Sequence, residues 1–249
     1  MNSDLTHFPR RFVLVGGTSF ALSGCGRKDA ASATAGKAPD SQPPPATTPG
    51  SSAGQSRIVT MLGDSITAGY GLAAADALPA QLEIALTVLG LTVRVRPAGV
   101  SGDTTAGGLA RVDFSVQADT ELCIVALGGN DLLQGVAPSA TRSNLDQIIK
   151  RLQARGIAVL LAGMRAPPQY GAYAREFDKV FVDLAREDDV TAYPFLLNGV
   201  ALDRRYNQAD GIHPNAAGVK IIAAALAPVV AEALAHLSMP PPSGVVFSR

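Results

Sequence analysis

Short apolar runs alternate with longer amphipathic stretches through the central part of the chain. The apolar runs lie at 58–62, 92–96, 121–127, 157–162 and 190–197, and their lengths and residue types are typical of β-strands. The run at 121–127 is nearly uninterrupted, which indicates a central strand that is buried on both faces. Five strands separated by helical stretches predict an α/β domain in which helices cover both faces of a parallel sheet.

Apolar residues at helical spacing fill the intervals between the predicted strands. The first such stretch runs from Leu78 to Gly90, with Pro79 in its first turn. A second follows Ser139, a candidate N-cap, and a third carries an apolar stripe over 173–184. The closing helix follows Asn215, another candidate cap.

The composition changes at both ends of this patterned domain, which we place at 57–237. Residues 1–25 are typical of an export signal, with a basic start, an apolar run too short to span a bilayer, and a small-residue cleavage site. Residues 26–56 are rich in Ala, Ser, Thr, Pro and Gly and predict a disordered tether, and 238–249 predict a loose Pro-rich tail. Only the patterned domain can bury a core.

The signal ends in Leu22-Ser23-Gly24-Cys25, which resembles the bacterial lipobox. By that resemblance Cys25 carries a lipid, and the chain is an exported lipoprotein of the bacterial cell envelope, anchored to a membrane and facing the periplasm. A plain secretory signal that happens to contain a cysteine is the alternative. Arg10-Arg11 resemble a twin-arginine signal only loosely, so the general secretory and twin-arginine routes both stay open.

Charge and residue counts exclude several classes of site. The formal net charge is zero, with 21 basic and 21 acidic residues and no basic cluster beside aromatic residues, which argues against a nucleic-acid partner. If Cys25 is lipidated, Cys123 has no disulfide partner, and its apolar surroundings indicate a small buried hydrophobe. No metal-ligand spacing is present, so we expect no metal site.

Polar residues suited to serine chemistry follow the predicted strands. Ser65 follows the first strand, a Gly-rich loop with Gly102 follows the second, and Asn130 follows the third. Open α/β sheets place their ligand crevices at these carboxyl ends. His213 is the one histidine outside the signal and the last helix, and Asp210 precedes it closely enough to hold one ring nitrogen. Taken alone, each loop could be an ordinary turn.

Four ordered blocks of sequence resemble the SGNH (GDSL) hydrolase family. The blocks are Gly63-Asp64-Ser65, Gly102, Gly129-Asn130-Asp131 and Asp210-Gly211-Ile212-His213-Pro214. The resemblance spans about 57–237, and the stretches GDSITAGYGL, SGDTTAGGLARV and DGIHPN look like the branch of periplasmic acyl-CoA thioesterases, lysophospholipases and arylesterases. It implies a flavodoxin-like three-layer α/β/α sandwich with a five-stranded parallel sheet.

The same resemblance implies a role for each candidate site residue. Ser65 would be the nucleophile, His213 the general base and acid, and Asp210 the carboxylate that orients it. The Ser65 amide, the Gly102 amide and the Asn130 side chain would form an oxyanion hole, and no cofactor is required. We therefore expect a serine esterase that hydrolyses acyl esters or thioesters through an acyl-enzyme, with arylesterase, lysophospholipase or thioesterase activity.

Two other functions stay open at this point. One is a carbohydrate O-acetyl esterase, because related folds perform that reaction. The other is a lipid-anchored binding protein that keeps the fold without turnover, although such a protein would not need a base aligned to a hydroxyl. The expected partners are a small acyl ester or lipid substrate and, through Cys25, a membrane; nucleic acid is not expected. We expect the chain to be a monomer.

Overall fold

The structure is a computed structural model, and it describes residues 56–188 and 190–238. The export signal with Cys25, all but the last residue of the tether, and the tail beyond Ser238 lie outside the described residues. The predictions for those segments therefore stay predictions.

Five parallel strands form one sheet in the order β2-β1-β3-β4-β5. The strands are β1 (Arg57–Gly63), β2 (Val93–Gly99), β3 (Leu122–Ala126), β4 (Ala158–Ala162) and β5 (Thr191–Tyr193). This is the flavodoxin-like order, and its switch point lies where β1 adjoins β3. The register sets Gly63 beside Gly99 on one side and Ala126 on the other, so small residues end the three adjacent strands β2, β1 and β3 together.

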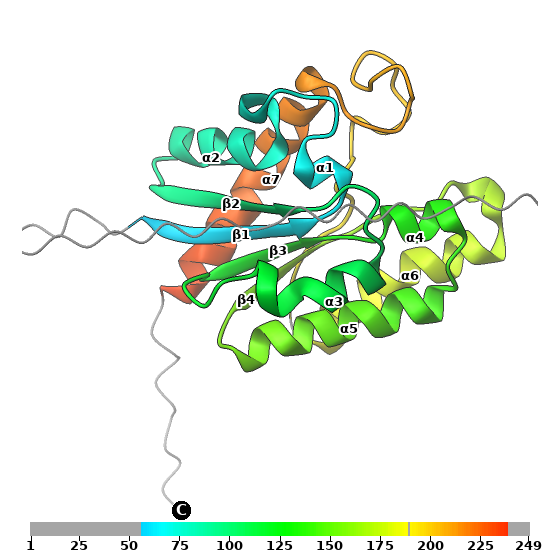
Figure 1. Cartoon of the computed structure of the whole chain (residues 1–249), viewed down its shortest axis with the longest axis horizontal. Helices are drawn as coiled ribbons and strands as arrows, with labels where there is room; N and C mark the ends of the chain where they lie inside the picture. Colours follow the sequence, from blue (N-terminus) through cyan, green and yellow to red (C-terminus); the bar gives the residue numbers. More distant parts are fainter. Residues whose placement is uncertain (1–55, 189, 239–249) are drawn as a thin grey trace, which may run out of the picture. The chain divides into compact units, whose positions relative to one another are not determined.

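Seven α-helices are present in the described part of the chain, with two short 3₁₀ turns. They are α1 (Ser65–Ala68), α2 (Leu78–Val88), α3 (Thr105–Ser115), α4 (Gly129–Gln134), α5 (Pro138–Ala154), α6 (Ala172–Glu187) and α7 (Ala216–Leu237), with η1 (Ala74–Asp76) and η2 (Pro168–Tyr170). Helices α2 and α7 pack together on one face of the sheet, and α3, α5 and α6 pack side by side on the other (Figure 1). The expected three-layer architecture is confirmed.

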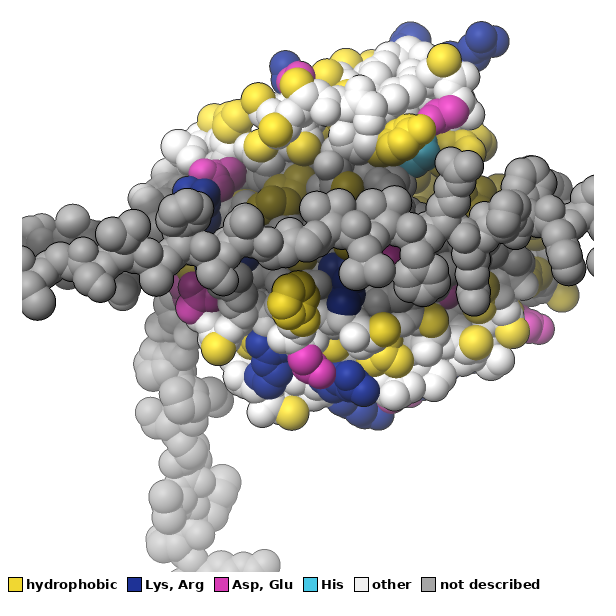
Figure 2. Space-filling view, in the orientation of Figure 1, with side chains coloured by type: hydrophobic (Ala, Val, Ile, Leu, Met, Phe, Trp, Pro, Cys, Tyr) yellow, Lys and Arg dark blue, Asp and Glu magenta, His cyan; other side chains and the backbone are white. Residues whose placement is uncertain are grey.

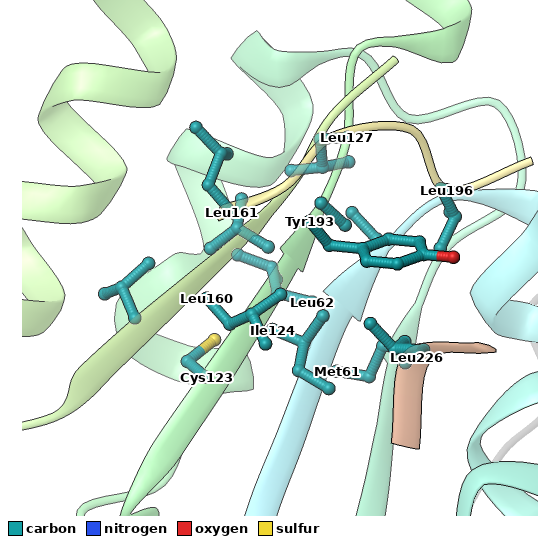
Figure 3. Packing of buried hydrophobic residues seen from close by; sticks show 14 of the residues in the cluster. Met61, Leu62, Cys123, Ile124, Leu127, Leu160, Leu161, Tyr193, Leu196 and Leu226 are labelled. Carbon is teal, nitrogen blue, oxygen red and sulfur yellow. The ribbon is translucent and has the colours of Figure 1, made fainter. Parts of the chain in front are cut away.

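The core lies on both faces of the central strands. Every side chain of β3 is buried, as its uninterrupted apolar run predicts, and Cys123 packs there among aliphatic neighbours (Figure 3). Burial raises the pKa of the Cys123 thiol to about 12, so the group is an inert hydrophobe in this environment. Helix α7 is apolar and long enough to cross a membrane, but half of that stretch is buried, as expected for a core helix.

Two local predictions were wrong, and one helix was not predicted. Helix α3 was not foreseen, because Gly107 and Gly108 interrupt its helical pattern. Helix α5 starts at Pro138 with no side-chain cap, so Ser139 does not cap it. Strand β5 spans three residues rather than the predicted run of 190–197, because Pro194 cannot donate to a strand ladder. The cap at Asn215 is confirmed, since its side chain accepts hydrogen bonds from the amides of residues 217 and 218.

Strand β2 forms one edge of the sheet, and its outward-facing groups have specific partners. The amide of Val95 donates to the Glu83 carboxylate of α2 at 2.8 Å rather than to another strand. Two residues along, on the same side of the strand, Pro97 has no amide hydrogen. The edge therefore offers few free donors.

Candidate active site

Ser65 is the first residue of α1, directly after β1. The side chain of Asp64 caps this helix by accepting a hydrogen bond from the amide of Ile66 at 3.0 Å. The helix sits against the end of β2, where a Cβ on Gly99 would lie only 2.4 Å from the backbone nitrogen of Ala68. The absence of that methyl group therefore lets Ser65 lie close to the strand ends.

The loop before α7 brings His213 to Ser65. Nε2 of His213 lies 2.9 Å from Oγ of Ser65, and Nδ1 lies 2.8 Å from Oδ2 of Asp210. The other oxygen of Asp210 accepts hydrogen bonds from the amides of Ile212 and His213. These amide hydrogen bonds, with that of the His213 ring, lower the pKa of Asp210 to about 2, so its carboxylate is ionised at neutral pH. A charged acceptor at Nδ1 leaves Nε2 free to accept the Ser65 proton.

Gln208 and Tyr70 fix the position of the histidine loop. The side-chain amide of Gln208 donates to the carbonyls of Tyr70 at 2.7 Å and of Pro214 at 3.0 Å. Its backbone amide donates to the carbonyl of His213 at 2.8 Å. The Tyr70 ring packs on the His213 ring with 4.6 Å between centroids. One glutamine thus joins the segment after Ser65 to the loop that carries the histidine.

Asp64 is a second carboxylate near the histidine. It is only 4 % exposed, and burial raises its pKa to about 6, although the Ile66 amide and the positive form of His213 oppose that rise. The carboxylate is therefore mostly ionised at neutral pH. A buried negative charge there attracts the imidazolium that arises when His213 takes a proton from Ser65.

Asn130 lies in the first turn of α4, just beyond the end of β3. Its side-chain amide donates one hydrogen bond to the carbonyl of Asp103 at 2.9 Å. The neighbouring Asp131 is buried, and its carboxylate accepts hydrogen bonds from Thr105 and Thr141. Asp131 binds the amide of Thr105, the first residue of α3, and Asn130 binds the carbonyl of Asp103. Helix α4 therefore holds both the start of α3 and the loop before it.

Gly102 lies in the turn that precedes Asp103. Its φ of 87° is in the left-handed region, and a Cβ there would meet open space, so backbone conformation rather than crowding favours glycine. Gly102 is not among the residues that line the pocket described next. Its role as an oxyanion donor stays a prediction.

A mostly apolar pocket of about 480 Å³ opens beside Ser65. Its walls come from α1, α4, the loop after β4 and the long connection between β5 and α7. Their apolar residues include Ile66, Leu132, Leu133, Met164, Ala166, Pro167, Phe195, Leu197, Leu202 and Ile212. Leu133, Leu202 and Ile212 are exposed at its rim, and Leu202 is 83 % exposed. Charged side chains also line the pocket: Asp64 and Asp178 are among its residues, and the guanidinium of Arg165 lies 5.8 Å from the centre of the Phe195 ring. The pocket suits an apolar chain beside a reactive hydroxyl.

The described surface and interior show little that would serve a different chemistry. Basic side chains lie on several separate parts of the visible face, with acidic side chains beside them (Figure 2). Within 56–188 and 190–238, no three His, Cys, Asp or Glu side chains lie together as a metal site would require. The pocket at Ser65 is therefore the main candidate site of the described chain.

The structure brings together Ser65, Asp210 and His213, and Asn130 lines the pocket that Ser65 and His213 also line; the catalytic roles of these residues stay predictions. Sequence reasoning missed Gln208, Tyr70 and Asp131, which support these residues. Asp131 and Tyr70 lie inside quoted motifs and Gln208 lies just before one, but nothing in a motif says which amide, carbonyl or ring a side chain will meet. The family blocks were the only signal that could have drawn attention to them.

Comparison with known proteins finds similar proteins of one family. A family model described as the GDSL-like lipase/acylhydrolase family matches residues 61–221. The chain is 39 % identical over 160 residues to "Esterase TesA" of Pseudomonas aeruginosa, covering 64 % of this chain and 80 % of that protein. It is also 39 % identical over 157 residues to "Thioesterase 1/protease 1/lysophospholipase L1" of Escherichia coli K12, covering 62 % and 74 %. Among solved structures, the SGNH-hydrolase esterase AlinE4 superposes with a TM-score of 0.61 at 49 % identity, covering 73 % of this chain and 98 % of that one.

Proposed function

Because the chain belongs to the GDSL-like lipase/acylhydrolase family and is a hydrolase of ester bonds, we propose that Ser65, His213 and Asp210 perform that hydrolysis as a catalytic triad. The observation that carries the proposal is the unbroken series of contacts from the Asp210 carboxylate through His213 to the Ser65 hydroxyl, at the mouth of an apolar pocket. Neither contact exceeds 2.9 Å, so no rearrangement is needed before proton transfer.

The proposed reaction has two halves. Oγ of Ser65 attacks the ester carbonyl while Nε2 of His213 takes its proton, and the Asp210 carboxylate holds Nδ1 and stabilises the imidazolium. The tetrahedral oxyanion collapses, the alcohol or thiol leaves with the proton from His213, and an acyl group stays on Ser65. Water activated by His213 then attacks the acyl-enzyme, and the same proton steps release the acid and restore Ser65.

The proposed oxyanion donors are the Ser65 amide, the Gly102 amide and the Asn130 side chain. An asparagine side-chain amide carries two hydrogens, and the bond to the carbonyl of Asp103 uses only one of them. The second is available to the pocket that Asn130 lines. The hydrogen bond to Asp103 fixes the orientation of the second N–H group of Asn130. A donor that is oriented in advance stabilises the charge that develops in the transition state.

The pocket supports an acyl group with a hydrocarbon chain as the substrate. Its walls are aliphatic and aromatic, and its volume of about 480 Å³ lies in the range of small-molecule sites. A carbohydrate acetyl ester would place most of its sugar hydroxyls against apolar walls, with few polar side chains such as Arg165 and Asp178 as partners, and an unpartnered buried hydroxyl is costly. The relatives named for thioesterase and lysophospholipase activity support thioesters and lysophospholipids as members of the same substrate class.

The proposal is tested by the acyl-chain dependence of hydrolysis. p-Nitrophenyl esters from acetyl to palmitoyl are assayed beside a lysophospholipid and an acyl-CoA. We expect kcat/KM to rise from acetyl to medium chains, by about 0.8 kcal/mol or severalfold per buried methylene, until the pocket is full. Activity confined to acetyl esters of sugars, with no gain from a longer acyl chain, would favour the carbohydrate esterase instead.

We further propose that Cys25 anchors the protein to a membrane, on the strength of the lipobox sequence. Substitution of Cys25 by Ser removes the atom that would carry the lipid, and we expect the protein to move from the membrane fraction to the soluble periplasmic fraction. Cys123→Ser serves as the matched control, because its thiol is buried in β3 and should not affect fractionation. If Cys25→Ser stays with the membranes as the unchanged chain does, the anchor is elsewhere.

A further inference from the structure

We propose that Arg111, together with Asp103, is a positioning residue that sets the geometry of the oxyanion hole. Arg111 lies on α3, does not line the substrate pocket, and belongs to none of the residues assigned a catalytic role above. The inference rests on the oxyanion donors proposed above and adds the residues that hold those donors in place.

The guanidinium of Arg111 joins the ends of two strands. Nη2 donates to the carbonyl of Gly63 at 2.8 Å, and Nη1 donates to the carbonyl of Ala98 at 2.9 Å. Gly63 ends β1 two residues before Ser65, and Ala98 is near the end of β2, four residues before Gly102. The segments that carry two proposed amide donors are thus held by one rigid planar group.

The same guanidinium reaches the third donor through Asp103. Nε of Arg111 donates to Oδ2 of Asp103 at 2.6 Å, and the backbone carbonyl of Asp103 accepts the amide of Asn130 at 2.9 Å. Arg111 therefore contacts the segments before Ser65 and Gly102 directly, and it reaches the Asn130 side chain through Asp103. Lysine could not copy this, because an ammonium lacks the planar fork that meets several fixed acceptors at once.

The burial of the pair makes it more than a surface ion pair. The side chains of Arg111 and Asp103 are 18 % and 17 % exposed, so solvent screens their charges less than it screens an exposed pair. A Cβ on Gly107 would lie 2.7 Å from the Asp103 carboxylate, so the glycine leaves that carboxylate its place beside α3. Arg111 holds the Asp103 carboxylate on one side and α3 lies close to it at Gly107 on the other, so the pair can act as a rigid support for the oxyanion donors.

A comparison of two arginine substitutions tests the inference. Arg111→Ala should lower kcat by about ten- to a hundredfold with KM within about threefold, because displacement of donors by about an ångström weakens transition-state binding. The matched control is Arg96→Ala: Arg96 also bonds an aspartate, Asp119, through two nitrogens, but lies away from the pocket. The control should keep wild-type kcat.

Two further measurements separate positioning from stability. A boronic acid inhibitor, which forms a tetrahedral adduct on Ser65, should lose affinity by nearly the same factor as kcat in Arg111→Ala. Arg111→Lys and Asp103→Asn, which change the fold less, should give intermediate losses in the same direction.

The outcomes are distinct. Equal kcat losses in Arg111→Ala and Arg96→Ala, or unchanged inhibitor affinity beside a lowered melting temperature, would overturn the inference. So would full activity in both Arg111→Lys and Asp103→Asn. The proposed function is tested on the wild-type protein alone: a wild type that hydrolyses no ester would refute the esterase. An active wild type with unaffected Arg111 variants would refute only the positioning role of Arg111.

Discussion

Substitution of Ser65 or His213 by alanine is expected to remove nearly all ester hydrolysis, with a fall in kcat on the order of 10⁵- to 10⁶-fold. Each substitution breaks the 2.9 Å contact through which the serine proton would be transferred. Because the two residues act in one step, the double variant should lose hardly more than either single variant. Asp210→Ala should cost less, since Ser65 and His213 stay in place.

Kinetics on the purified variants check this expectation, with two substitutions as controls. Ser139→Ala and His236→Ala change exposed residues that do not line the pocket, and both should keep wild-type rates. A serine-directed organophosphonate should label the wild type and fail to label Ser65→Ala. Independent, multiplicative losses in the double variant would show that Ser65 and His213 do not form a functional unit.

Asn130→Ala is expected to lower kcat by about a hundred- to a thousandfold with a modest change in KM, the usual loss for one oxyanion donor. The amide hydrogen that is not bound to Asp103 would contact the substrate oxygen most strongly after that oxygen becomes charged. The ground-state ester gains less, so KM changes little.

Another asparagine, Asn198, provides the control for this second prediction. Asn198→Ala changes an exposed residue outside the pocket lining and should leave kcat unchanged. Thermal unfolding of both variants shows whether loss of the bond to Asp103 has loosened the fold. A large rise in KM at constant kcat would instead assign Asn130 to substrate binding.

The sheet could be predicted from the sequence because each strand has a local cause. The apolar run of β3 predicts a fully buried strand, and all five of its residues are buried. Helix α3 could not be predicted, because its glycines serve a tertiary contact: a Cβ on Gly108 would lie 2.2 Å from Cδ1 of Leu127. Close packing of α3 on the sheet therefore requires residues that helix propensity disfavours.

The residues of the site also fall into those that could be predicted from the sequence and those that could not. Ser65, Asp210 and His213 could be found because short blocks of sequence carry them, and Asp210 and His213 lie on one loop. Arg111 and Gln208 could not be found, because their partners are backbone carbonyls, which every residue carries. A side chain that binds carbonyls at distant positions leaves no pattern in the sequence of its partners.

The two edges of the sheet affect whether copies of the protein can aggregate. An unpaired edge strand is a template for strand addition, and thus for aggregation. At β2 the Glu83 carboxylate occupies the amide of Val95 and Pro97 has none to offer, while the opposite edge, β5, is only three residues long. Neither edge offers an incoming strand a continuous row of partners. The sheet is therefore protected against growth into fibres even at the high local concentration that anchoring to a surface would create.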